Sequence, residues 1–356
     1  MPINTPQDLR DHIELAIQVE LSTIPPYLFA MYSIEDQESE SALLIRSIVV
    51  EEMLHAVLAS NLLLAVGGSP SFGGTHYMPT YPSELPHHRP PLVLDLAPCS
   101  PELIENLFMR IEQPETHGAP AQPDEFETLG QFYHALEQGL EQMAGSFDLF
   151  AGPQIKRQMS DPSFYSPVTF DADDSGGLVG ITDLESAIAA IEIIVHQGEG
   201  MSDDRWADPD HQELTHYYKL LQIHDGTSPL GPVRPLRANP RSGDYPEDLQ
   251  AVSDLFNAVY RALYLTMDRL FDGKSDQSRG VGVLYLLMAD VLSRLGRFLV
   301  AQPLGAGEFA GPTFEVFEFE GGDPIEQLVQ MSADVAATNP ELASVHDAIR
   351  GLNLIL

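Results

Sequence analysis

The sequence of 356 residues contains a single cysteine, Cys99. One thiol cannot form an intrachain disulfide, and alone it cannot supply a cysteine-rich zinc site or the ligands of an iron–sulfur cluster. Cys99 follows Pro98 in a stretch typical of a loop, where we expect it to be a small apolar filler. A metal site in this chain therefore cannot be rich in cysteine.

Positive charge is also scarce. Lysine and arginine number 18 against 53 aspartates and glutamates, which gives a formal net charge of −35. The only lysines are Lys156, Lys219 and Lys274. A chain this acidic is repelled by nucleic-acid backbones and by anionic membrane surfaces, so we expect neither as a partner. Self-repulsion of such a surface favours solubility.

Long apolar runs are missing as well. The longest nearly apolar run, 280–289, is followed by Asp290 and is too short to span a bilayer. The first ten residues, MPINTPQDLR, lack the basic and apolar regions of a signal peptide. We therefore expect a soluble cytoplasmic protein.

What the sequence has in abundance is helical periodicity, which predicts an all-α fold. Apolar residues recur at helical spacing in four segments before residue 225. These segments cover about 5–33, 41–66, 124–150 and 183–223, with a polar interruption at 201–209. The Pro- and Gly-rich residues 67–123 predict a long excursion between the second and third helices, with a short helix from Ser100 to Ile111.

The pattern predicts three parts in chain order. Residues 1–225 are expected to form a four-helix bundle, and residues 226–245 carry the turn-forming composition of a linker. Residues 246–356 are expected to form a C-terminal helical extension. Its predicted helices cover about 246–271, 279–300 and 324–337, with a short alternating stretch at 314–320.

Two E-x-x-H motifs carry the chemistry. Glu52 with His55, and Glu213 with His216, are each three residues apart on a predicted helix and so share a face. Di-metal carboxylate bundles take one Glu from each of two helices and one E-x-x-H from each of the other two. Glu20 and Glu137 lie on the apolar seams of the first and third helices and complete that order.

Charge supports this interpretation. Four carboxylates and two divalent metals balance, whereas unpaired carboxylates in an apolar seam would cost several kcal/mol each, roughly. Carboxylate and imidazole ligands suit iron, with manganese as the alternative, and we expect two ions per chain. A third match, Glu84 with His87, contains Pro86 and cannot form a helical face. Glu51 and Glu141 are expected to be solvated neighbours of the seam.

Several segments together resemble a known family. VELSTIPPYL, VVEEMLHAVLASNLL, LGQFYHALEQGLEQM, IIVHQGEG, ELTHYYKLLQI and AGPTFE are similar to the ferritin-like family that includes the iminophenyl-pyruvate dimer synthases of violacein and rebeccamycin biosynthesis. The resemblance covers roughly residues 8–225, and more loosely extends to 315. It implies a ferritin-like four-helix bundle with a non-haem iron site. Carried over by position, the implied ligands are Glu20, Glu52, His55, Glu137, Glu199 and His216.

The fourth helix offers two carboxylates for one ligand position. Spacing favours Glu213, because it forms the E-x-x-H motif with His216. The resemblance favours Glu199, and the flanking Gly198 and Gly200 would let the backbone distort and bring its carboxylate closer. We expect Glu199 to be the ligand, with Glu213 as a first-turn acid of the resumed helix.

Together these features predict an O2-dependent non-haem di-iron oxidoreductase. Its substrate is expected to be a small amino-acid-derived compound or an aromatic amine of secondary metabolism. Two alternatives are a ferroxidase or iron-binding protein, and a non-catalytic subunit that binds a partner enzyme of the same pathway. The sequence leaves the oligomeric state open.

Overall fold

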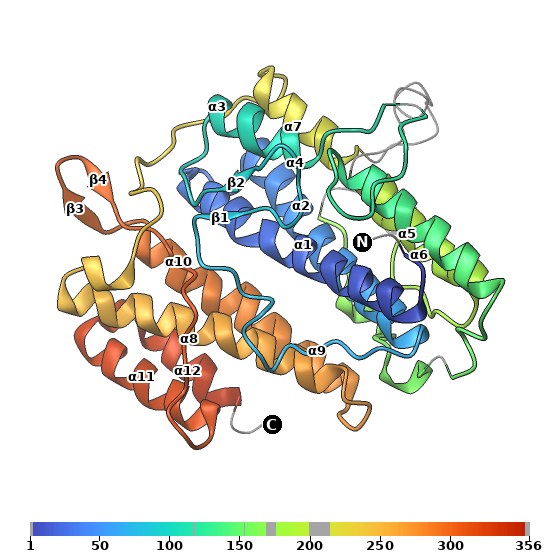
Figure 1. Cartoon of the computed structure of the whole chain (residues 1–356). Helices are drawn as coiled ribbons and strands as arrows, with labels where there is room; N and C mark the ends of the chain where they lie inside the picture. Colours follow the sequence, from blue (N-terminus) through green and yellow to red (C-terminus); the bar gives the residue numbers. More distant parts are fainter. Residues whose placement is uncertain (1–2, 117, 153, 169–175, 199–213, 353–356) are drawn as a thin grey trace.

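Two long helices form the centre of the computed structural model, which describes residues 3–352 except 117, 153, 169–175 and 199–213 (Figure 1). They are α1 (Pro6–Ser33) and α2 (Glu40–Ala65). The Thr5 side chain and Asp8 form a capping box at the start of α1, and Ser39 caps α2. α1 continues through Pro26, and the Tyr81 hydroxyl donates to the Ser22 carbonyl that this proline cannot satisfy.

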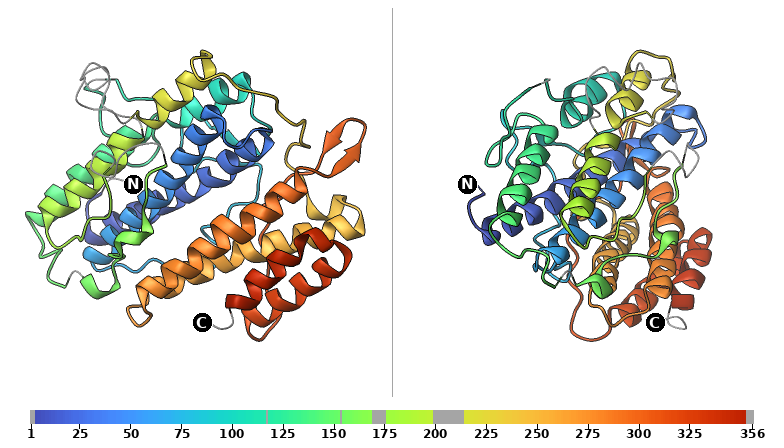
Figure 2. Two further views of the ribbon diagram at one scale, coloured as in Figure 1. Left: turned by 180° about the vertical axis from the view of Figure 1, so that it is seen from behind. Right: turned by 90° about the vertical axis from the view of Figure 1, so that its right-hand side faces the viewer.

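Each of the other two sides of the bundle is broken into two helical stretches that follow one another along the chain (Figures 1 and 2). A stretch can contain several contiguous elements. One side consists of α3 (Pro101–Leu103), the π-helical turn η1 (Ile104–Phe108), α4 (Met109–Ile111) and then α5 (Leu129–Ala144). The other consists of α6 (Leu184–Gln197) and α7 (His216–His224). α5 packs against α6, whereas α7 packs against η1 and α4. The third helix was predicted to cover about 124–150, but α5 is shorter, at Leu129–Ala144.

Part of the predicted excursion, residues 101–111, forms helical structure that packs in the bundle. Residues 67–100 form loops and the short antiparallel pair β1 (Ser83–Glu84) and β2 (Val93–Leu94). The helix predicted from Ser100 is confirmed, with the Ser100 hydroxyl accepting from the Leu103 N–H. Because this segment packs against α7, it belongs to the bundle wall and not to a covering loop.

The C-terminal part forms a second helical layer. Residues 226–245 contain only the short 3₁₀ turn η4 (Ser242–Asp244), consistent with their turn-forming composition. The layer comprises α8 (Glu247–Leu270), α9 (Gln277–Tyr285), the π-helical η5 (Leu286–Leu292), α10 (Ser293–Leu299), α11 (Pro324–Thr338) and α12 (Ala343–Leu352). Short elements are η2 (Ile155–Arg157), η3 (Pro162–Phe164), η6 (Pro340–Leu342) and the paired strands β3 (Pro303–Gly305) and β4 (Glu308–Phe309). The alternating stretch 314–320 forms no strand.

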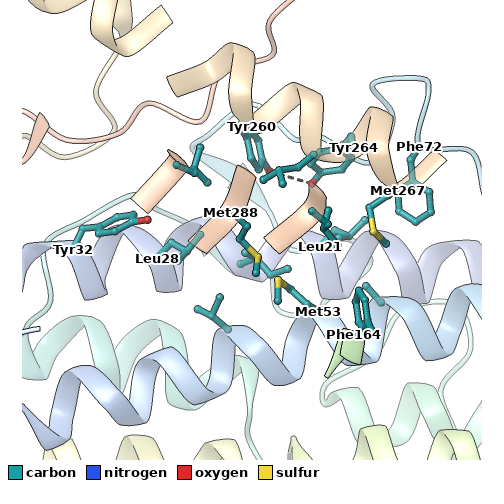
Figure 3. A pocket seen from close by; sticks show the side chains of 16 residues that line it. Leu21, Leu28, Tyr32, Met53, Phe72, Phe164, Tyr260, Tyr264, Met267 and Met288 are labelled. Carbon is teal, nitrogen blue, oxygen red and sulfur yellow. Dashed lines mark hydrogen bonds between the residues drawn. The ribbon is translucent and has the colours of Figure 1, made fainter. Parts of the chain in front are cut away.

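One hydrophobic core runs through both layers. Between them lies an apolar cavity of about 110 Å³ (Figure 3). α1 and α2 line it with side chains that include Leu21 and Met53, and the C-terminal layer contributes Tyr260, Tyr264 and Met288. The C-terminal helices therefore cover one face of the α1–α2 pair, which leaves the opposite face of the pair for α5 and α6.

α2 is long and apolar enough to cross a membrane by length and composition. Within the protein, 89% of its most apolar window is buried, as in the core helix of a globular fold.

The segment that contains Gly311 approaches α1 closely, and this contact gives a stability prediction. A Cβ atom at Gly311 would lie 2.5 Å from Cε2 of the buried Phe29. We expect Gly311→Ala to lower the free energy of unfolding by about 1–3 kcal/mol, because Phe29 and its neighbours must shift. Urea unfolding checks this. Gly321→Ala is the matched control, since a Cβ there meets nothing within 4 Å; equal stabilities of the two variants would contradict the prediction.

Candidate metal centre

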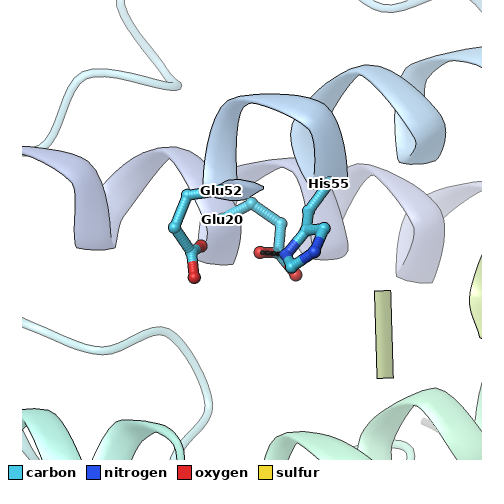
Figure 4. Close-up of side chains that lie close together, drawn as sticks. All are labelled: Glu20, Glu52 and His55. Carbon is cyan, nitrogen blue, oxygen red and sulfur yellow. Dashed lines mark ion pairs between the residues drawn. The ribbon is translucent and has the colours of Figure 1, made fainter. Parts of the chain in front are cut away.

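α1 and α2 bring three ionisable side chains together in the bundle interior (Figure 4). Glu20, Glu52 and His55 are buried, and one possible ligand atom from each lies within 4.8 Å of the others. His55 Nδ1 is 3.4 Å from a Glu20 carboxylate oxygen. Glu52 and His55 are one helical turn apart, so the E-x-x-H spacing places both on the face that meets Glu20.

A second group shares Glu52 with the first. It consists of Glu52, Glu112 and His216, again with ligand atoms within 4.8 Å of one another. His216 Nδ1 lies 3.1 Å from Oε1 of Glu52 and 3.4 Å from Oε2 of Glu112. The His55 and His216 rings stack with their centroids 5.4 Å apart. Glu52 is thus common to both groups, and its carboxylate would be shared if each group held an ion.

Glu112 is the residue that sequence reasoning missed. It is the C-cap of α4, at the point where one bundle wall breaks before α5. A signal was present, because Ile104, Phe108 and Glu112 are spaced by four residues and share one helical face. Ile104 and Phe108 are fully buried, so this face turns inward and carries Glu112 into the core.

Hydrogen bonds hold the three carboxylates in place. The Tyr133 hydroxyl donates to Glu20, and the Tyr27 hydroxyl donates to Oε1 of Glu112 at 2.5 Å. The Thr23 hydroxyl lies 3.0 Å from Oε2 of Glu52. Burial, reinforced by the negative charge of Glu112, raises the pKa of Tyr27 well above its usual value. Tyr27 therefore stays a protonated donor.

The imidazole of His55 is also hydrogen-bonded through the ring nitrogen that points away from Glu20. Its Nε2 lies 2.9 Å from Oε1 of Gln197, the last residue of α6. An Nε2–H that donates to this oxygen leaves Nδ1 with its lone pair toward Glu20.

The donor set fits divalent metal ions. Glu20, Glu52 and Glu112 are buried carboxylates, and among the described residues the groups facing them are imidazoles and hydroxyls, with no lysine or arginine in contact. His216 Nδ1 is buried and makes no hydrogen bond within the described structure, although two carboxylate oxygens lie within 3.4 Å. Burying such groups without a compensating cation is costly. Two ions coordinated by imidazole and carboxylate would resolve both features.

The cavity at this centre is small. It has a volume of about 10 Å³ and is walled by Leu129, Ile194 and Val195 in addition to the ligand side chains. That is roughly the space of a single water molecule.

A family model described as Ferritin-like matches residues 13–225. The chain belongs to the ferritin-like family. The match begins within α1 and ends just after α7, so it contains both candidate ligand groups. A solved relative, the crystal structure of a ferritin-like protein from Caulobacter vibrioides, has a TM-score of 0.62 and 26% identity; the alignment covers 87% of this chain and 100% of that one. The ferritin-like fold expected from the sequence is confirmed.

Two curated relatives are named as enzymes. The 2-imino-3-(indol-3-yl)propanoate dimerase of Chromobacterium violaceum is 27% identical over 87% of this chain and 34% of its own length. The dichlorochromopyrrolate synthase of Lentzea aerocolonigenes is 24% identical over 89% of this chain and 36% of its own. This chain therefore spans about a third of the length of these relatives.

The structure places one predicted ligand of this ferritin-like chain, Glu137, apart from the centre. Glu137 on α5 is half-buried and belongs to neither ligand group; its carboxylate interacts with His134, Glu141 and Glu192. The carboxylate from that wall of the bundle that lies in a candidate ligand group is Glu112. One reason is that α5 begins only at Leu129, so Glu137 lies two turns beyond the break in the helix.

Three further expectations concern residues near the motifs. Glu84 lies on β1, and the ring of His87, which has a left-handed φ of 61°, bonds the Asp124 carbonyl, so this E-x-x-H match forms no helical face, as expected. Glu141 is exposed, as predicted. The expectation of a solvated Glu51 is wrong: Glu51 is 1% exposed and pairs with the buried Lys219.

Glu199 and Glu213 lie outside the described residues, so the choice between them stays a prediction. A Cβ at the preceding Gly198 would lie 3.6 Å from Oε2 of Glu112, so the end of α6 reaches the centre. We expect Glu199→Gln to weaken iron binding by about 10-fold or more and Glu213→Gln to leave it nearly unchanged. Fe(II) titration of the two variants checks this, and the reverse pattern would assign the ligand to Glu213.

Metal binding should also release protons. Burial, with Glu20 and Glu112 nearby, raises the pKa of Glu52 well above its usual value, which favours the protonated carboxyl when no metal is bound. Burial lowers the pKa of His216, but Glu112, Glu51 and Glu52 outweigh this and raise it well above its usual value. A metal must displace both protons, so apparent affinity should rise about tenfold per pH unit for each proton released. Calorimetry in buffers of different ionisation enthalpy measures the release; an affinity that is flat with pH would contradict it.

Proposed function

We propose that this chain is a non-haem di-iron oxidoreductase that uses O2 on a small organic substrate. The observation that carries the proposal is the pair of buried ligand groups joined by Glu52. A bridging carboxylate with one imidazole on each side is the donor set expected of two adjacent iron ions, and manganese has similar ligand preferences. The proposed ligands are Glu20 and His55 for one ion and Glu112 and His216 for the other, with Glu52 shared.

Iron held there would supply the capacity to bind and reduce O2. The chain's own residues would set the geometry and the protonation of the centre. Tyr133 and Tyr27 restrain the terminal carboxylates by donating hydrogen bonds, and Gln197 fixes the ring of His55. The apolar walls formed by Leu129, Ile194 and Val195 limit access of bulk water to the ligands.

The relatives support the enzymatic part and the class of substrate. One is named as a dimerase of 2-imino-3-(indol-3-yl)propanoate, and the other as a dichlorochromopyrrolate synthase. We propose an amino-acid-derived imine or an aromatic amine of secondary metabolism as the substrate, with the reaction taking place in the cytoplasm. Because the chain spans about a third of those relatives, its own activity has to be measured directly.

The test is to load the full chain with Fe(II) under anaerobic conditions and then to admit O2 with and without candidate imino acids and aromatic amines. We expect O2 consumption that depends on the organic substrate, and a product mass that differs from the non-enzymatic control. The Glu52→Gln variant should consume no O2 above that control. O2 consumption in fixed ratio to Fe(II), with no organic product, would indicate a ferroxidase instead. Failure to bind iron at all would favour a non-catalytic binding subunit.

A further inference from the structure

Glu51 and Lys219 form a buried ion pair beside the centre, and neither residue belongs to the two ligand groups. Glu51 is 1% exposed and Lys219 is fully buried. The Lys219 Nζ lies 2.6 Å from Oε1 and 2.5 Å from Oε2 of Glu51. Oε2 of Glu51 also lies 2.9 Å from Nε2 of His216. The pair thus contacts the ring nitrogen of His216 that faces away from Glu52 and Glu112.

We propose that the Glu51–Lys219 pair positions His216 for metal binding. A carboxylate can only accept, so Nε2 of His216 must carry the hydrogen that it donates to Glu51. In the neutral ring this leaves the lone pair on Nδ1, the atom that lies 3.1 Å from Glu52 and 3.4 Å from Glu112. The pair thereby selects the tautomer and the ring orientation that the second ligand group needs. This inference rests on the proposed metal centre.

The position of His216 in the fold explains why it needs such support. His216 is the first residue of α7, so no preceding turn of that helix packs against its ring. Lys219 is three residues later and on the same face of α7, while Glu51 precedes Glu52 on α2. The pair therefore connects the start of α7 to the helix that carries Glu52, the residue shared by both groups.

The lysine has a separate electrostatic role. A lone Glu51 would add a fourth buried negative charge beside Glu20, Glu52 and Glu112, and its oxygens would be free to bind a cation at the wrong place. Both oxygens instead contact Lys219, which cancels the charge and leaves Glu51 as an ionised acceptor for His216.

Two double variants separate positioning from simple packing. Glu51→Gln with Lys219→Met removes both charges but keeps an oxygen that accepts from Nε2. Glu51→Met with Lys219→Met removes both charges and the acceptor, with similar volume. Because each removes both charges of the Glu51–Lys219 pair together, both are expected to fold. The probe is Co(II), titrated into the metal-free full chain and followed by visible absorption and by metal stoichiometry.

We expect the wild type and the Gln/Met variant to bind two Co(II) ions with affinities within about threefold of each other. The Met/Met variant should keep one ion and lose roughly 10–100-fold in affinity for the other, with a changed ligand-field spectrum. A Met/Met variant that binds both ions like the wild type would overturn the proposal. Absence of Co(II) binding to the wild type would instead refute the metal centre itself.

A second readout does not depend on the Met/Met variant folding. In the Co(II)-loaded wild type, the Nε2–H of His216 should give a paramagnetically shifted proton signal that is present in H2O and lost on full exchange into D2O. The Gln/Met variant should shift this signal and speed its exchange, because the acceptor is weaker. An identical signal in the two proteins would show that Glu51 does not hold that proton, and would overturn the proposal.

Discussion

Glu52→Gln is expected to remove both metal ions. Glu52 is the only carboxylate shared by the two ligand groups of the described structure, so its loss affects each ion. We expect iron affinity to fall by at least about 100-fold, since even residues behind the ligands contribute 10–100-fold. Elemental analysis after iron loading and removal of free metal should fall from two ions per chain to well below one.

The fold of the metal-free variant should be nearly unaffected. Burial raises the pKa of Glu52 and so favours its neutral acid, which has the same shape as glutamine. The matched control is Glu137→Gln, which changes a half-buried glutamate outside both ligand groups and should retain two ions. Equal metal loss in the two variants would make Glu137 a ligand as the helix seams predicted, and metal loss in Glu137→Gln alone would contradict the assignment of Glu52.

Of the three lysines in the chain, Lys219 is the one whose replacement by methionine is expected to destabilise the fold most. It leaves Glu51 buried without its cation, and breaking a buried pair from one side costs about 3–5 kcal/mol of unfolding free energy. Chemical unfolding of the metal-free protein measures this. Lys274→Met is the control, because Lys274 is exposed and its loss should change stability by no more than about 0.5 kcal/mol.

The same pair predicts a pH dependence. Burial alone would raise the pKa of Glu51, but Lys219 and His216 outweigh it and lower the pKa to about 2, from 4.5 in the unfolded chain. A depressed folded pKa contributes stability above pH 4.5 that is lost as the pH falls toward 2. The wild type should lose this contribution over that range, whereas Lys219→Met, which keeps only the His216 part, should lose less. Parallel stability curves for the two proteins would contradict the pairing.

Local sequence patterns were enough to predict the two central helices and the three residues of the first candidate ligand group. α1 and α2 begin and end within two residues of their predicted bounds, because Thr5 and Ser39 are strong caps and the apolar spacing is regular. The seams also pointed to Glu20, Glu52 and His55, which the fold brings together. A ligand whose neighbours lie one turn away on the same helix can be recognised from spacing alone.

The helix bounds and the candidate ligand on the other side of the bundle could not be predicted, because they depend on contacts between segments far apart in the sequence. α5 could not be bounded from periodicity, because the wall to which it belongs is broken between Ile111 and Leu129. Glu112 follows a short helix inside a Pro-rich stretch, and only the packing of that helix against α7 brings it to His216.

The E-x-x-H motif, the charge balance and the helical class of this ferritin-like chain were all determined by the sequence itself, since each depends on residue type and on spacing within one helix. Tertiary structure decided which carboxylate from the other wall of the bundle lies next to His216. It also decided that Glu51, adjacent to a predicted ligand and expected in solvent, is buried against a lysine 168 residues away. Burial and partner choice depend on which helix packs on which face, and that is a property of the folded chain as a whole.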